Sequence, residues 1–108
     1  MRIEVSRDVF RLAQVFTISR GSRTEAQVLT VRITDGGVTG WGECVPYARY
    51  GETLESVSAE IEALSGPLTR DALYDLLPAG AARNAVDCAL WDLQAKQAGK
   101  PVWELAGL

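Results

Sequence analysis

Two arginines in the run S-R-G-S-R-T are the side chains best suited to bind a small anion. Arg20 and Arg23 stand on either side of Gly21, where the backbone can bend tightly because glycine has no side chain. An arginine in such a bend can present its planar guanidinium to a carboxylate through two parallel hydrogen bonds. Most loop arginines are solvated, so the pattern leaves a carboxylate-binding role and a solvent-exposed role open.

Carboxylates are scattered over a predicted strand and two predicted helical segments: they are Glu43, Asp87, Asp92 and Glu104. Their spacing does not bring three oxygen ligands to one cation, so we expect no magnesium site in this stretch. Asp87 and Asp92 lie about 140° apart around a helix, on different faces. Each stands four residues from a cation, Arg83 for Asp87 and Lys96 for Asp92, which favours structural ion pairs.

No recognisable catalytic set accompanies these residues. The sequence has no histidine, and it contains no glycine-rich phosphate loop, no H-E-x-x-H and no G-x-S-x-G. Cys44 and Cys88 are far apart and outside any C-x-x-C spacing, so they favour neither a disulfide framework nor a zinc site. We expect both cysteines to pack as small apolar side chains, and Trp91 and Trp103 to be packing residues as well.

The composition is that of a soluble globular protein. The 108 residues are 47% hydrophobic and 23% charged, and the formal net charge of −3 favours neither nucleic acid nor an anionic membrane as a partner. No stretch approaches the roughly 18 apolar residues of a spanning helix, and the N-terminus has no signal-peptide core. We therefore expect one small cytoplasmic domain.

The first half of the chain predicts three strands. Residues 2–6 alternate polar and apolar types, and a change of parity by Phe10 indicates a bulge near Arg7 or Asp8. The pattern lapses over residues 14–24, which we predict to be a loop of about ten residues.

The clearest strand signal covers residues 29–34, where apolar and polar types alternate strictly. The Asp-Gly dipeptide that follows predicts a hairpin returning into a third strand over residues 38–45. Gly40 and Gly42 share one face of that strand, which indicates close approach by another backbone or a large ring.

Helices are predicted for the second half. Thr53 and Thr69 are suited to cap two of them, and Gly99 with Pro101 ends a longer one running from about Gly80 to Ala98. The expected buried positions of the first two are Leu54, Val57, Ile61 and Leu64, then Leu73, Leu76 and Leu77. Residues 79–82 are small, so another backbone or a ligand-bearing loop can approach there, and a short helical turn is expected over Val102 to Leu105. Strands followed by helices predict an α+β fold.

The run A-R-N-A-V-D-C-A-L-W-D-L-Q-A-K, followed by P-V-W-E-L, carries a resemblance. It is similar to the signature of the mandelate racemase and muconate lactonizing branch of the enolase superfamily. The departure is Ala106, where the family usually has a larger aliphatic residue. With I-S-R-G-S-R-T-E-A and G-E-C-V-P-Y-A-R-Y-G-E, the chain from Ile18 onward resembles the dipeptide epimerases that act on L-Ala-D/L-Glu.

The resemblance implies that residues 1–108 are an N-terminal capping domain, with a three-stranded antiparallel sheet followed by a helical bundle. The domain would end about where a C-terminal (β/α)8 barrel begins. Two loops, residues 16–24 and 45–53, would close over the barrel mouth and select the substrate. By resemblance, Arg23 reads the glutamyl carboxylate of the substrate, and the other substrate-binding residues are Ile18, Ser19, Tyr47 and Tyr50.

The implied chemistry is abstraction and return of a proton next to a carboxylate. In the family it needs two lysine bases and three acidic ligands for Mg²⁺, all in the barrel, so no catalytic or metal residue is expected in this stretch. Lys96 and Lys100 match neither base. The implied partners of the full-length isomerase are a dipeptide substrate and its own barrel domain, while homo-oligomer formation stays open.

Two alternatives to the Ala-Glu epimerase stay open. The first is the cap of another superfamily member, such as an acylamino-acid racemase or an enzyme of the muconate or o-succinylbenzoate type. The second is a non-catalytic binding module with the same fold. A K-x-K motif followed by spaced Asp and Glu ligands downstream of Leu108 would identify an enzyme.

Overall fold

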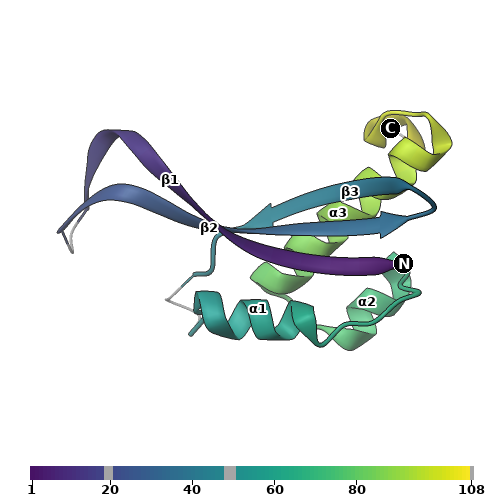
Figure 1. The fold of residues 1–108 in the computed structure, drawn as a ribbon, viewed down its shortest axis with the longest axis horizontal. Helices are drawn as coiled ribbons and strands as arrows, with labels where there is room; N and C mark the ends of the chain where they lie inside the picture. The colour runs from purple at the N-terminus through teal and green to yellow at the C-terminus, as the bar shows by residue number, and fades with distance from the viewer. Residues whose placement is uncertain (19–20, 48–50, 108) are drawn as a thin grey trace.

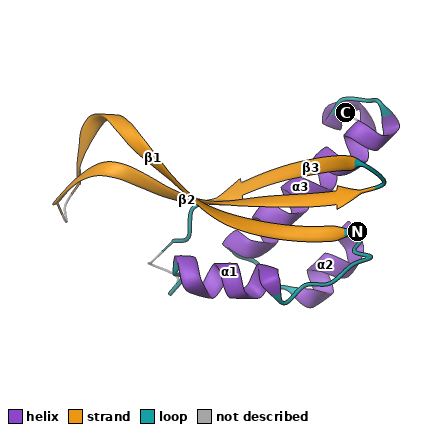
Figure 2. Cartoon of the chain, viewed as in Figure 1, coloured by secondary structure: helices purple, strands orange, loops and turns teal. Residues whose placement is uncertain are grey.

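The computed structural model describes residues 1–18, 21–47 and 51–107, and for residues 9–26 it describes the backbone alone. A sheet precedes the helices along the chain, which confirms the predicted α+β class (Figures 1 and 2). The elements are β1 (Arg2–Ile18), β2 (Gly21–Asp35), β3 (Val38–Cys44), α1 (Leu54–Glu62), α2 (Arg70–Leu76), α3 (Ala81–Ala98) and α4 (Val102–Leu105).

The three strands form one antiparallel sheet in the order β1-β2-β3. β3 ends where Cys44 lies opposite Leu29. Past that point β1 and β2 continue as a two-stranded ribbon as far as the pair Ile18 and Gly21. Figure 1 shows this ribbon projecting away from the helices.

The ribbon corrects two predictions about the first strands. Most of the predicted loop over residues 14–24 is paired strand, and pairing is unbroken at Arg7 and Asp8, where we predicted a bulge. The register shift lies farther along, between Arg11 and Phe16. Backbone pairing holds a ribbon without a covering layer, so its side chains need not follow the two-residue period of a half-buried strand.

The core lies between the sheet and α3, where β3 and the helix approach very closely. A Cβ on Gly42 would lie 2.0 Å from the Ala85 carbonyl oxygen, and one on Gly40 would lie 2.2 Å from that of Ala89. Both alanines are fully buried. The predicted close approach at the two glycines is therefore confirmed, and the approaching element is the backbone of α3.

The N-caps of α1 and α2 are the predicted threonines. The Thr53 hydroxyl accepts from the Ser56 N–H while the Ser56 hydroxyl accepts from the Thr53 N–H, and Thr69 caps through the Ala72 N–H. Leu76, predicted to be buried, is 57% exposed. α2 ends at this residue, and the extended backbone of the next residue, Leu77, carries that side chain into the core instead.

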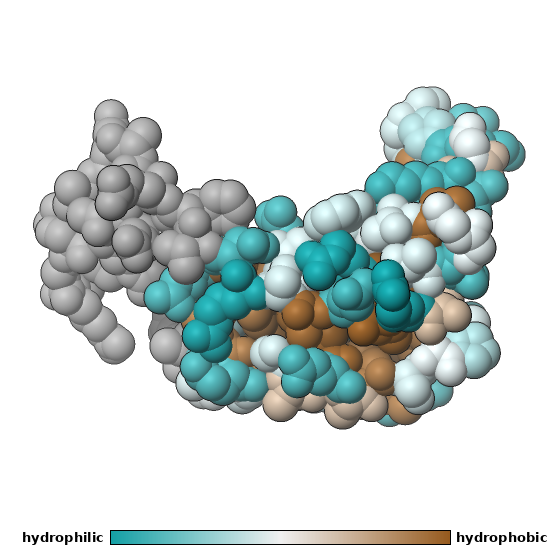
Figure 3. Space-filling model, in the orientation of Figure 1, coloured by the Kyte–Doolittle hydropathy of each residue, from teal (hydrophilic) through white to brown (hydrophobic). Residues whose placement is uncertain are grey.

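The surface between β1 and α1 is apolar. Figure 3 shows apolar side chains gathered between the strand and the helix. Ile3, Val5, Leu54 and Leu64 are partly buried and pack against the core. The core therefore reaches the surface along this edge of the domain.

Two predicted packing residues are on the surface. Cys88 on α3 lies outside the buried stripe of that helix and is exposed, and Trp103 on α4 is 60% exposed. Trp91 is half-buried under the guanidinium of Arg70, 3.3 Å from the ring centroid. Cys44 is buried as predicted, and burial together with the nearby Glu52 carboxylate raises the pKa of its thiol to about 11.

Asp92 and Lys96 join α3 to the open edge of β3. The Asp92 carboxylate lies 2.8 Å from the Lys96 ammonium, which confirms the predicted ion pair, and it accepts from the Trp41 N–H at 2.8 Å. Lys96 donates to the Thr39 carbonyl oxygen at 2.9 Å. These bonds satisfy backbone groups that an edge strand would otherwise leave to solvent.

The Asp92→Ala variant is expected to lower the free energy of unfolding by about 1–2 kcal/mol. Partial burial alone would raise the pKa of Asp92, but the Lys96 ammonium and the Trp41 N–H outweigh it and hold that pKa below its ordinary value. Such a carboxylate stabilises the fold above its unfolded pKa, about 3.9, and this contribution is lost as the pH falls through the folded pKa.

Urea unfolding of the wild type and the variant at about pH 7 and about pH 3 measures this dependence. We expect the difference between them to shrink at the lower pH. Lys100→Ala, which changes an exposed lysine just past the same helix, is the control and should stay within about 0.5 kcal/mol of the wild type. An Asp92→Ala loss of the same size at both pH values would assign the effect to packing.

Candidate functional site

The two segments predicted to bind substrate leave the sheet at the same end. The end of β1 at Ile18, the start of β2 at Gly21 and the end of β3 at Cys44 all point toward that end because the strands are antiparallel (Figure 1). Ile18 is the last paired residue of β1, and Arg23 pairs with Phe16 two residues into β2. Their backbone therefore lies near the ribbon tip, while Ser19, Arg20 and Tyr50 lie outside the described residues.

Tyr47 stands after the end of β3 with an exposed side chain. Its N–H donates to Glu52 Oε1 at 3.0 Å, and its carbonyl oxygen accepts from the Glu52 N–H at 3.4 Å. Glu52 thus binds both backbone polar groups of Tyr47. These two hydrogen bonds join Tyr47 to Glu52 within the second candidate segment, residues 45–53.

Glu52 also reaches the start of α3. Its other oxygen, Oε2, accepts from the Ala81 N–H at 2.9 Å, whereas the N-cap residue Gly80 provides no side-chain cap. The small residues at 79–82 were predicted to allow a close approach, and Glu52 is what approaches. Sequence reasoning missed Glu52 itself, although a long helix starting at a glycine without a capping side chain was a signal for an acceptor from elsewhere.

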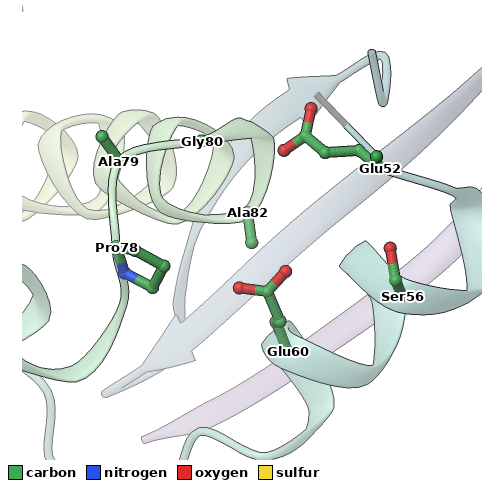
Figure 4. Close-up of a pocket in the computed structure, with 8 residues that line it drawn as sticks. Glu52, Ser56, Glu60, Pro78, Ala79, Gly80 and Ala82 are labelled. Carbon is green, nitrogen blue, oxygen red and sulfur yellow. The ribbon is translucent and has the colours of Figure 1, made fainter. Parts of the chain in front are cut away.

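A pocket of about 590 Å³ lies beside this contact, between α1 and the start of α3 (Figure 4). In Figure 4 the carboxylates of Glu52 and Glu60 lie on one side of it and the small residues of the α3 start on the other. Its lining consists of Gly51, Glu52, Ser56, Glu60, Pro78, Ala79, Gly80 and Ala82. Among the described residues, this lining includes no lysine, cysteine or histidine that could act as a base or nucleophile.

The described residues also lack a side-chain group of the kind that binds metal ions in proteins. They contain no group of three or more histidine, cysteine, aspartate or glutamate side chains that could hold a metal ion.

The predicted ion pair between Arg83 and Asp87 is not formed. Arg83 instead stacks over the Tyr74 ring, 4.6 Å from its centroid, and Asp87 Oδ1 is buried without a hydrogen-bond partner. No helix in the described ranges is long and apolar enough to span a membrane.

The chain is similar in sequence and in structure to several known proteins. The L-Ala-D/L-Glu epimerase of Escherichia coli (strain K12) is 46% identical over 110 residues, which cover 98% of the chain and 34% of the relative. An enolase family member from Agrobacterium tumefaciens with homology to dipeptide epimerases, solved with L-Ala-L-Glu and an ordered loop, matches with a TM-score of 0.90. It is 51% identical, covering 98% of this chain and 34% of that one.

A third similar structure is the dipeptide epimerase from Methylococcus capsulatus, complexed with Mg and the dipeptide L-Arg-D-Lys. It has a TM-score of 0.84 and 33% identity, covering 98% of this chain and 34% of that one. The chain thus spans about a third of the length of these relatives. Its sheet and following helices match the N-terminal capping domains of the enolase superfamily.

The family model for the mandelate racemase / muconate lactonizing enzyme N-terminal domain matches residues 2–107. That range takes in every strand and helix of the structure, from β1 to α4. The chain therefore belongs to the mandelate racemase and muconate lactonizing enzyme N-terminal domain family of the enolase superfamily.

Proposed function

We propose that the chain is the substrate-specificity cap of a Mg²⁺-dependent dipeptide epimerase of the L-Ala-D/L-Glu type, with a C-terminal (β/α)8 barrel following residue 108. The observation that carries this proposal is the 51% identity to a structure solved with L-Ala-L-Glu. The arrangement of the chain supports it, because the ribbon tip and the segment after β3 leave the same end of the sheet. Two segments at one end can cover one opening.

In this function the barrel supplies the acid–base chemistry. Bound Mg²⁺ would stabilise the negative charge that develops on the substrate carboxylate as the neighbouring proton leaves. The described residues of this chain do not fit that metal, since they lack a group of three ligands. The contribution of the cap is to bind the dipeptide, orient it and exclude water.

Arg23 is the proposed specificity residue. Its backbone lies near the ribbon tip, from which a long side chain can reach beyond the domain. A guanidinium binds a carboxylate in bidentate fashion, so it suits the side chain of a glutamyl residue. Ile18, Ser19, Tyr47 and Tyr50 are proposed to line the rest of the substrate-binding surface.

The test uses the full-length protein and L-Ala-L-Glu in deuterated water. We expect NMR to record exchange of the glutamyl α-proton for deuterium in the presence of Mg²⁺. Residues 1–108 produced alone should give no exchange and no stoichiometric Mg²⁺ binding by calorimetry, because bases and ligands would be missing. Exchange with N-acetylglutamate but not with the dipeptide would favour an acylamino-acid racemase, and a tight one-to-one Mg²⁺ site in residues 1–108 would contradict the assignment as a cap.

A further inference from the structure

We propose that Glu52 is a positioning residue of the cap: its carboxylate holds Tyr47 in a defined position relative to α3. One carboxylate oxygen accepts from the Tyr47 N–H at 3.0 Å, and the other accepts from the Ala81 N–H at 2.9 Å. Tyr47 is five residues before Glu52, whereas Ala81 is 29 residues after it. The inference rests on the proposed function, in which Tyr47 belongs to the substrate-binding surface.

The start of α3 is built to receive this carboxylate. The first N–H groups of a helix have no partner within the helix, and the positive end of the helix dipole favours a negative charge there. α3 has no acidic residue in its first turn, and Gly80 makes no side-chain cap. A Cβ on Gly80 would lie 3.0 Å from Glu52 Oε2, so the glycine leaves the space that the carboxylate occupies.

The backbone of Glu52 is also anchored. The next residue, Thr53, is the N-cap of α1, and its reciprocal hydrogen bonds with Ser56 form a capping box. Glu52 therefore extends from the fixed start of one helix to the start of another. Tyr47, whose N–H and carbonyl oxygen both bind Glu52, is located relative to both helices.

Removal of the carboxylate breaks the bond to the Tyr47 N–H and uncouples Tyr47 from the start of α3. It leaves the cap of α1 intact, because the bonds between Thr53 and Ser56 do not involve Glu52. The bases and metal ligands of the proposed enzyme lie in the barrel. A misplaced Tyr47 should therefore weaken substrate binding more than turnover, which appears as a higher KM with little change in kcat. A purely structural effect would reduce the fraction of folded enzyme, which lowers the apparent kcat and leaves KM unchanged.

The experiment compares variants of the full-length protein. We expect Glu52→Ala to raise KM for L-Ala-L-Glu about tenfold with kcat within about threefold of the wild type. Glu52→Gln keeps one acceptor oxygen and should give a smaller rise. Gly80→Ala should also raise KM, because its Cβ displaces the same carboxylate. Glu60→Ala is the matched control, since Glu60 lines the same pocket and has no hydrogen bond to other described residues, and it should behave as the wild type.

Hydrogen–deuterium exchange measured by mass spectrometry tests the hydrogen bond between Glu52 and the Tyr47 N–H and does not depend on enzymatic activity. In Glu52→Ala, the peptide containing Tyr47 should exchange at least about tenfold faster than in Glu60→Ala. If the Tyr47 peptide exchanges faster in Glu52→Ala but the wild type is inactive on every dipeptide, the positioning contact is supported and the proposed function is rejected. Unchanged exchange together with an unchanged KM in Glu52→Ala would overturn the positioning role, even if the wild type is an active epimerase.

Discussion

Gly42→Ala is expected to lower the free energy of unfolding by at least about 3 kcal/mol, a large part of the stability of a small domain. The new Cβ would lie 2.0 Å from the Ala85 carbonyl oxygen and 2.9 Å from the Ala89 nitrogen, both backbone atoms of α3. No rotamer change relieves such a contact, because the obstructing atoms belong to a helix. Either β3 or α3 must move, and the buried residues between them must repack.

Thermal or urea denaturation and the yield of soluble protein measure this loss. Gly40→Ala should act in the same direction, since its Cβ would lie 2.2 Å from the Ala89 carbonyl oxygen. Glu43→Ala is the matched control on the same strand, because Glu43 is exposed, and it should stay within about 0.5 kcal/mol of the wild type. A Gly42→Ala protein with the melting temperature of the wild type would contradict the close packing of β3 on α3.

Under the proposed function, Arg23→Ala in the full-length protein should lower kcat/KM for L-Ala-L-Glu by at least about a hundredfold. If Arg23 pairs with the glutamyl carboxylate away from water, its removal leaves that carboxylate desolvated and unpaired. Losing one partner of a buried charge pair costs about 3–5 kcal/mol, whereas losing a solvated arginine costs less than about 1 kcal/mol. Steady-state kinetics can separate these outcomes easily.

Substrates and variants provide the controls for Arg23. Dipeptides with an uncharged second residue should react about as well with Arg23→Ala as with the wild type, because they make no ion pair. Arg20→Ala should have a milder effect, since we assign Arg20 a supporting or solvated role. Equal losses on charged and uncharged dipeptides would mean that Arg23 shapes the ribbon tip and does not bind the substrate, and the Ala-Glu assignment would fall back to an unspecified member of the superfamily.

Local signals in the sequence predicted the helices well. Thr53 and Thr69 cap α1 and α2, and α3 ends at Gly99 in the left-handed conformation expected of a glycine C-cap. These three caps depend on residues within one turn of the helix end, so the local sequence contains the whole interaction. The hairpin after Asp35 was predictable for the same reason, because a two-residue turn sets the pairing of its flanking strands.

Burial at element ends was less predictable. Leu76 matched the apolar stripe of α2, but the helix ends there and the chain turns Leu77 inward. Trp103 is apolar and yet exposed on α4. A side chain at the end of a helix follows the direction of the next segment, which the helical period does not encode.

The sequence by itself determined the α+β class, the caps, the glycine face of β3 and the family signature, since all of these depend on neighbouring residues. Only the tertiary structure decided that residues 16–18 pair with residues 21–23 at the end of a ribbon, and that Glu52 caps a helix beginning 29 residues later. The ribbon is joined by backbone hydrogen bonds, which almost any residue type can form, so side-chain patterns along the chain do not reveal it. The Glu52 carboxylate accepts from a backbone N–H far along the chain, and the residue type of Ala81 carries no sign of that partner.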